Sequence, residues 1–191
     1  MSVQAGPDGL PRCPWALGSA DYLAYHDEEW GRPVTGEAAL FERLCLEGFQ
    51  AGLSWITILR KREAFREAFA GFDPAIVARF GEDEIGELMA NPGIVRNRAK
   101  IQATVSNARA LLALPDEESL EALLQKHRPQ PRPAPQATAD VPAATPESKS
   151  LSSELRARGF RFIGPVTAYA MMQATGYVND HLADCVVRSR W

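Results

Sequence analysis

The segment from Leu40 to Trp55 has apolar residues at helical spacing, with a carboxylate among them, and this feature constrains the chain most. Its apolar stripe consists of Leu40, Phe41, Leu44, Cys45 and Gly48. At 100° per residue Glu47 lies about 20° from Leu40, on the stripe, whereas Glu42 and Arg43 take the polar side. Burying a carboxylate is costly unless binding or chemistry requires it. Two interpretations stay open: a surface glutamate at the edge of an imperfect stripe, or a glutamate inside a ligand pocket.

Aromatic residues are concentrated in the sequence around this segment. They are Trp15, Tyr22, Tyr25, Trp30, Phe49 and Trp55. A carboxylate in an aromatic pocket suits binding of, and chemistry on, a flat ligand that forms hydrogen bonds.

The rest of the chain predicts an all-α fold. Asp73 before Pro74, and Thr145 before Pro146, read as helix N-caps followed by proline in the first turn. Residues 91–93 predict a tight turn, residues 94–114 a helix, and Gly159 a helix end. Strand-like alternation is scarce, except around residues 160–163.

Length and composition favour a single domain. We expect this domain to span residues 12–191, after an N-terminal extension of residues 1–11 that is flexible. The Pro- and Ala-rich residues 128–145 predict an extended, partly mobile connection within it.

Charge and hydropathy bound the possible partners. The net charge of −3 counts mildly against nucleic-acid binding but leaves room for local basic clusters, such as residues 60–62 and 96–100. No apolar run approaches the ~20 residues of a membrane span, and residues 1–13 do not resemble a secretion signal. We therefore expect a cytoplasmic protein with no membrane partner, and nothing in the sequence suggests an oligomer.

The cysteines and histidines are few and lie mainly near the two ends of the chain. Cys13 and His26 are near one end, and His181 and Cys185, four residues apart in an expected helix, are near the other. Two cysteines and two histidines form a closed tetrahedral set typical of a structural zinc ion. The alternative, buried thiols with two hydrogen-bonded histidines, stays open. Three cysteines in a reducing compartment make a disulfide framework improbable.

A glycine step at Ile163-Gly164 lies between two predicted helices. In helix–hairpin–helix elements, such a turn directs backbone N–H groups toward a DNA phosphate without reading sequence. A glycine that merely joins two helices explains the same pattern.

Six sequence segments, in order along nearly the whole chain, resemble the DNA-3-methyladenine glycosylase I family of the helix–hairpin–helix superfamily. They are RCPW, DYLAYHDEEWG, LCLEGFQAGLSWITILRKR, GIVRNRAKIQATVSNARA, RGFRFIGPVTAYAMMQATG and VNDHLADC. The resemblance implies an all-helical enzyme that hydrolyses the N-glycosidic bond of 3-methyladenine in alkylated double-stranded DNA and leaves an abasic site.

The resemblance also implies residue roles. The base-recognising, catalytic glutamate falls on Glu47, the stacking aromatics fall on Tyr25 and Trp55, and one zinc ion would be held at the chain ends. The zinc ligands fall on Cys13, His26, His181 and Cys185. Other pocket aromatics match Trp15, Tyr22 and Trp30, and the expected DNA contacts are Gln50, Leu53 and Gly164.

Two other classes of function are weighed against this one. A zinc-stabilised DNA-binding module would explain the glycine turn and the basic clusters but not Glu47 among aromatic residues. An unrelated helical enzyme acting on a small molecule would explain the pocket but not the glycine turn.

Overall fold

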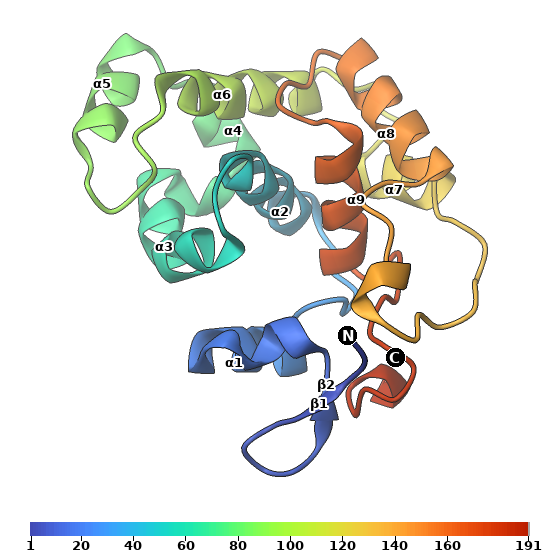
Figure 1. The fold of residues 1–191 in the computed structure, drawn as a ribbon. Coiled ribbons are helices and arrows are strands. Elements are labelled where there is room, and N and C mark those ends of the chain that lie inside the picture. The colour runs from blue at the N-terminus through green and yellow to red at the C-terminus, as the bar shows by residue number, and fades with distance from the viewer. Residues whose placement is uncertain (191) are drawn as a thin grey trace.

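The computed structural model describes residues 1–190, and helices dominate them (Figure 1). The α-helices are α1 Ala20–Glu28, α2 Glu37–Gln50, α3 Trp55–Ala68, α4 Pro74–Val77, α5 Glu82–Ala90, α6 Arg98–Leu112, α7 Leu120–Lys126, α8 Pro146–Ala157 and α9 Pro165–Ala174. Short 3-10 helices are η1 Pro14–Gly18, η2 Ala70–Phe72, η3 Thr138–Asp140 and η4 Arg188–Arg190. The predicted all-α class is confirmed.

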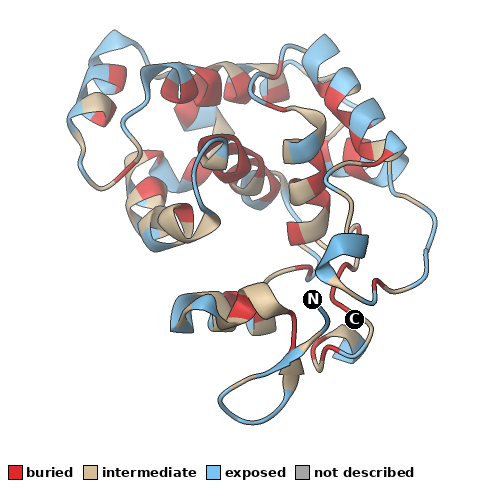
Figure 2. Ribbon diagram, in the orientation of Figure 1, coloured by how far each residue is buried: buried red, intermediate tan, exposed pale blue. Residues whose placement is uncertain are grey.

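Helix α2 runs through the middle of the molecule and is buried on nearly every side (Figure 2). The side of α2 that carries Glu42 and Arg43, which the helical projection gave as polar, therefore faces other helices and not solvent. Glu42 is buried and accepts hydrogen bonds from Arg66 of α3, and Arg43 donates to Glu29. Neighbouring helices neutralise these charges, which a helical projection of α2 alone does not reveal.

Local signals place several helix ends correctly. The Asp73 carboxylate accepts from the backbone N–H of Ala75, and the Thr145 hydroxyl accepts from that of Ser148. Helix α8 ends just before Gly159, which has a φ of 92° that favours glycine. The helix expected from residue 94 begins at Arg98 instead, because Asn97 caps it by accepting from the backbone N–H of Lys100.

The two ends of the chain lie side by side (Figure 1). Strands β1 Gln4–Ala5 and β2 Pro11–Arg12 pair as an antiparallel hairpin, which the sequence reading missed. The carbonyl oxygen of Pro11 then accepts from the backbone N–H of Val186 at 2.8 Å. The flexibility expected for residues 1–11 and the domain limits stay predictions, although this pairing ties part of the extension to the C-terminal segment.

One local prediction is wrong, because residues 181–185 form turns and not a helix. Their backbone follows long-range contacts with other segments. Residues 160–164 form the turn between α8 and α9, where the glycine step was expected between two helices. No helix within residues 1–190 combines the length and apolar character needed to cross a bilayer.

Candidate functional site

An aromatic cavity of about 280 Å³ lies between α1, α2 and α9, and Glu47 is at its wall. The five aromatic residues predicted for the pocket line it together: Trp15, Tyr22, Tyr25, Trp30 and Trp55. Gln50, the last residue of α2, also lines it, although the sequence reading placed Gln50 at the DNA. Ala170 and Gln173 of α9 complete the lining, and the sequence reading missed both.

Glu47 is buried, with 6% of its surface exposed, so the interpretation of a surface glutamate is wrong. Loss of water around the carboxylate raises its pKa to about 8, and the positive charge of Arg43 opposes that rise. It is the one carboxylate among the described residues that line the cavity. A neutral pocket of this kind is suited to a cationic guest, whose charge would favour the ionised form of Glu47.

The aromatic rings have fixed positions. The phenol oxygen of Tyr22 accepts from the backbone N–H of Ile56 at 3.0 Å, which joins α1 to the start of α3. The rings of Tyr25 and Trp55 have centroids 5.4 Å apart and are tilted by 44°. This spacing leaves no room for a base between the two rings. They form two walls that meet at a corner, against which a flat ligand would stack.

Gln173 is held in the cavity wall by a buried carboxylate. Its Nε2 donates to Asp180 at 2.8 Å, and Asp180 also accepts from the phenol of Tyr169 and from Arg132. Asp180 thus joins α9 to the Pro-rich connection, which carries Arg132. Asp180 itself is not among the residues that line the cavity.

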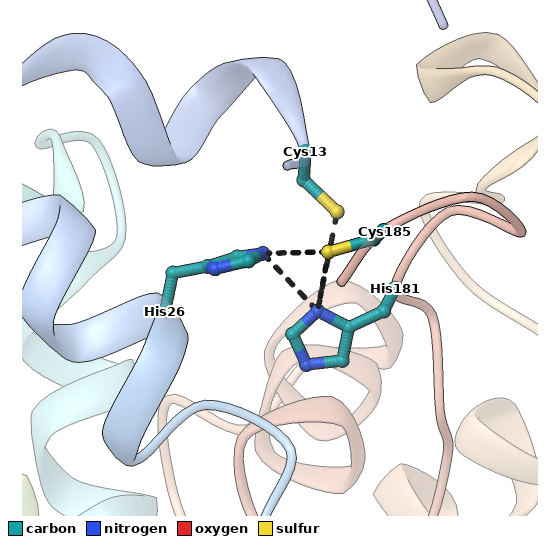
Figure 3. Close-up of side chains that lie close together, drawn as sticks. All are labelled: Cys13, His26, His181 and Cys185. Atoms are coloured by element: carbon teal, nitrogen blue, oxygen red, sulfur yellow. Dashed lines mark hydrogen bonds between the residues drawn. The ribbon is translucent and has the colours of Figure 1, made fainter. Parts of the chain in front are cut away.

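The four cysteine and histidine residues from the two chain ends converge in one buried cluster (Figure 3). Their ligand atoms, one from each of Cys13, His26, His181 and Cys185, lie within 4.8 Å of one another. Nε2 of His26 is 3.1 Å from Nδ1 of His181 and 3.5 Å from Sγ of Cys185. A tetrahedral zinc ion with two nitrogen and two sulfur ligands needs separations of roughly 3.3–3.8 Å. The donor set suits such an ion, and the separations between the ligand atoms, from 3.1 Å up to 4.8 Å, bracket this range.

The other ring nitrogen of each histidine already has an oxygen partner. Nδ1 of His26 is 2.7 Å from the Asp27 carboxylate, which Arg12 holds in turn, and Nε2 of His181 is 3.2 Å from the carbonyl oxygen of Trp30. If each of these nitrogens carries the proton, Nε2 of His26 and Nδ1 of His181 are the unprotonated ring nitrogens, and both face the other ligand atoms of the cluster. This outer arrangement is characteristic of histidines that bind metal ions.

The predicted DNA-contact residues lie apart from the cluster. Leu53 is exposed in the loop between α2 and α3, and Gly164 is the N-cap residue of α9. A side chain added at Gly164 would meet no protein atom within 4 Å, so the start of α9 is open to a ligand. First-turn N–H groups at such a helix start suit a phosphate.

A larger, more polar cavity of about 720 Å³ lies beside the Pro-rich connection. Its cationic side chains include Lys126 and Arg132, which are paired with Glu154 and Asp180. The aromatic cavity is the better candidate site because it combines a buried carboxylate with stacking surfaces.

Fold and site together define an all-α protein whose cavity offers aromatic rings for a flat ligand to stack on, beside a buried carboxylate. The chain belongs to the methyladenine glycosylase family, whose model matches residues 15–189. It is 47% identical to the DNA-3-methyladenine glycosylase of Haemophilus influenzae over 178 residues, which cover 91% of this chain and 96% of that protein.

Solved structures support the same placement. A crystal structure of a 3-methyladenine DNA glycosylase I shares 46% identity and a TM-score of 0.87, covering 92% of this chain and 98% of that one. The Staphylococcus aureus enzyme, solved to explain its recognition of 3-methyladenine, shares 36% identity and a TM-score of 0.86. That match covers 93% of this chain and 96% of the S. aureus chain.

Proposed function

We propose that this protein is a base-excision repair enzyme that hydrolyses the N-glycosidic bond of 3-methyladenine in alkylated DNA. The products are the free base and an abasic site. The observation that carries the proposal is the burial of Glu47 in an aromatic cavity of a methyladenine glycosylase family member. The S. aureus relative, which recognises 3-methyladenine, supports the choice of base.

Recognition depends on stacking and on charge. 3-Methyladenine in DNA carries a positive charge, and aromatic faces attract a cation that stacks on them. The walls formed by Tyr25 and Trp55 provide such faces, with Trp15, Tyr22 and Trp30 enclosing the rest of the cavity. An uncharged, correctly paired adenine gains less from this environment and must also be unstacked from the duplex.

Glu47 is the residue that would read the edge of the base. In its ionised form it accepts hydrogen bonds from the exocyclic amine of adenine, and its charge favours the cationic lesion. Burial opposes that ionisation, since loss of water around the carboxylate raises the pKa of Glu47 to about 8. Binding of the cation lowers this pKa, so the lesion itself creates the charged form that recognises it.

The chemical step needs little acid catalysis. The positive charge makes 3-methyladenine a good leaving group, so that the enzyme's main tasks are to extrude, orient and enclose the base. Glu47 is the carboxylate at the reacting base, which makes it the catalytic residue of this proposal.

A zinc ion held by Cys13, His26, His181 and Cys185 is part of the proposal. Such a closed site supplies structural cross-linking and no reaction chemistry. Its support is the donor set, the spacing of the ligand atoms and the outer hydrogen bonds of both histidines.

DNA contacts by Gln50, Leu53 and the α9 N-terminus at Gly164 complete the proposal. Action on double-stranded DNA, a monomeric state and a cytoplasmic location remain the expectations from the sequence.

The test is release of free bases from methylated genomic DNA, resolved by chromatography. We expect 3-methyladenine to be released while 7-methylguanine stays in the DNA, with Glu47→Gln as the matched control of strongly reduced activity. A folded wild-type protein that releases no base yet binds duplex DNA would instead support the DNA-binding module.

A further inference from the structure

Helix α6 extends two buried polar side chains to the two segments proposed to contact DNA. The first is Lys100, with 8% of its surface exposed. Its ammonium group donates to the carbonyl oxygens of Phe49 at 2.8 Å and Ala51 at 2.5 Å. These residues flank Gln50 at the end of α2, where helix carbonyl groups have no partner within the helix. Lys100 thus fixes the backbone from which the α2–α3 loop and Leu53 begin.

The second side chain is Asn107, seven residues further along α6. At 100° per residue it lies about 20° from Lys100, on the same face of the helix. Its Nδ2 donates to the carbonyl oxygen of Arg161 at 3.1 Å, and its Oδ1 accepts from the backbone N–H of Arg161 at 2.7 Å. Asn107 therefore satisfies both backbone groups of one residue in the turn between α8 and α9.

The turn held by Asn107 is conformationally strained. Phe162, the next residue, has a φ of 58°, which a bulky L-residue rarely adopts. Nearly half of its surface (47%) is exposed, and its backbone passes close to Gly48 of α2. Such a conformation persists only when its surroundings fix it, and the paired hydrogen bonds of Asn107 to the preceding residue do so. The turn leads directly to Gly164 at the start of α9.

We propose that α6 sets the spacing between the α2–α3 loop and the α8–α9 turn, with Lys100 and Asn107 as positioning residues for excision from duplex DNA. This inference rests on the proposed function. Neither residue lines the aromatic cavity. Their contacts are to backbone atoms, so they hold both segments in place whatever side chains those segments carry. Duplex DNA must meet both segments at once, whereas a free base needs only the cavity.

The experiment compares Lys100→Met and Asn107→Ala with the control Thr104→Val. Thr104 lies between the two residues on α6 and is also buried, but its hydroxyl donates to the carbonyl oxygen of Lys100 within the same helix. For each folded variant, three quantities are measured: kcat and KM on methylated duplex DNA, the Kd for free 3-methyladenine, and hydrogen exchange of the amides of residues 160–164.

We expect the KM for duplex DNA to rise about tenfold or more in both variants, since a shift of about 1 Å in a positioning element is costly. The Kd for the free base should stay within about threefold of wild type, and Thr104→Val should match wild type in both. Faster amide exchange in Asn107→Ala would support the turn's dependence on that side chain.

The inference is overturned if both variants keep the wild-type KM, or if they lose free-base binding in the same proportion as excision. If one variant does not fold, the other decides. If the wild-type protein releases no 3-methyladenine, the proposed function fails separately. The positioning role is then tested by the affinity for an undamaged duplex. A tenfold weaker affinity in the variants supports the inference, whereas an unchanged affinity overturns it.

Discussion

Trp30 belongs to the aromatic cavity and also contacts the metal-ligand cluster through His181. Its indole ring lies with its centroid 4.7 Å from that of the His181 imidazole, and its carbonyl oxygen is 3.2 Å from Nε2 of the same histidine. Trp30 also lies beside Trp15, with ring centroids 5.1 Å apart. The cysteine–histidine cluster therefore supports one side of the aromatic cavity.

Replacement of Cys185 should remove the metal ion and destabilise the fold. We expect Cys185→Ser to lower the melting temperature strongly, because structural zinc binding contributes directly to folding. Specific activity per folded molecule should fall less than stability does. Metal content and thermal unfolding are measured together, with Cys45→Ala as the control, since Cys45 is a buried core cysteine outside the cluster. A zinc-free, normally stable Cys185→Ser protein would remove the structural metal from the proposal.

Glu47→Gln should reduce excision of 3-methyladenine while preserving the fold. Loss of a charged hydrogen-bond acceptor costs about 1.5–3 kcal/mol, or roughly 10- to 100-fold in rate or affinity. Excision is followed by chromatography, and free-base binding by quenching of tryptophan fluorescence. Wild-type excision together with wild-type binding in this variant would show that Glu47 does not recognise the base.

A comparison of wild type with Glu47→Gln should also reveal the pKa of Glu47, through the pH dependence of the free energy of unfolding. An unfolded glutamate ionises near pH 4.5, whereas burial raises its folded pKa to about 8. Between these values the folded state holds its proton more tightly than the unfolded state does. Rising pH therefore destabilises the wild type over this window, and the loss becomes constant above pH 8.

Glu47→Gln lacks this titration, so its stability relative to wild type should grow from pH 4.5 to 8, by at most a few kcal/mol. Urea unfolding of both proteins at several pH values provides the measurement. Parallel stability profiles would mean that burial does not perturb this carboxylate.

Arg132→Met should destabilise the protein more than Arg128→Met. The Asp180 side chain is fully buried, and Arg132 is the cationic partner of its carboxylate. Without Arg132 a buried charge is left with only neutral donors, at a cost of about 1–3 kcal/mol. Arg128 lies on the same Pro-rich connection and is exposed, so its loss should have little effect. Equal urea midpoints for the two variants would contradict this account.

Local sequence signals predicted much of the helical architecture. Asp73 and Thr145 cap helices as expected, because a cap depends on residues within one turn of each other. The position of Glu47 on the stripe of α2 left burial as one of two interpretations, and the structure decides for burial because neighbouring segments cover that helix on nearly all sides.

Long-range contacts account for what the sequence did not predict. His181 and Cys185 come together through turns stabilised by the opposite end of the chain, so their four-residue spacing misleadingly suggested a helix. Nothing in the spacing of α6 indicates that Lys100 reaches the end of α2. Gln173 was missed as part of the cavity wall because its position depends on Asp180 and the packing of α9.

The ligand cluster joins positions far apart in the chain, since His26 and His181 are separated by 155 residues. A bound ion would convert the polypeptide between them into a closed ring that contains α2 to α9. Cleavage of one peptide bond in the Pro-rich connection would open that ring without releasing either fragment. The two halves would stay attached through the ion, in addition to their packing, and a chelator would remove that link between them.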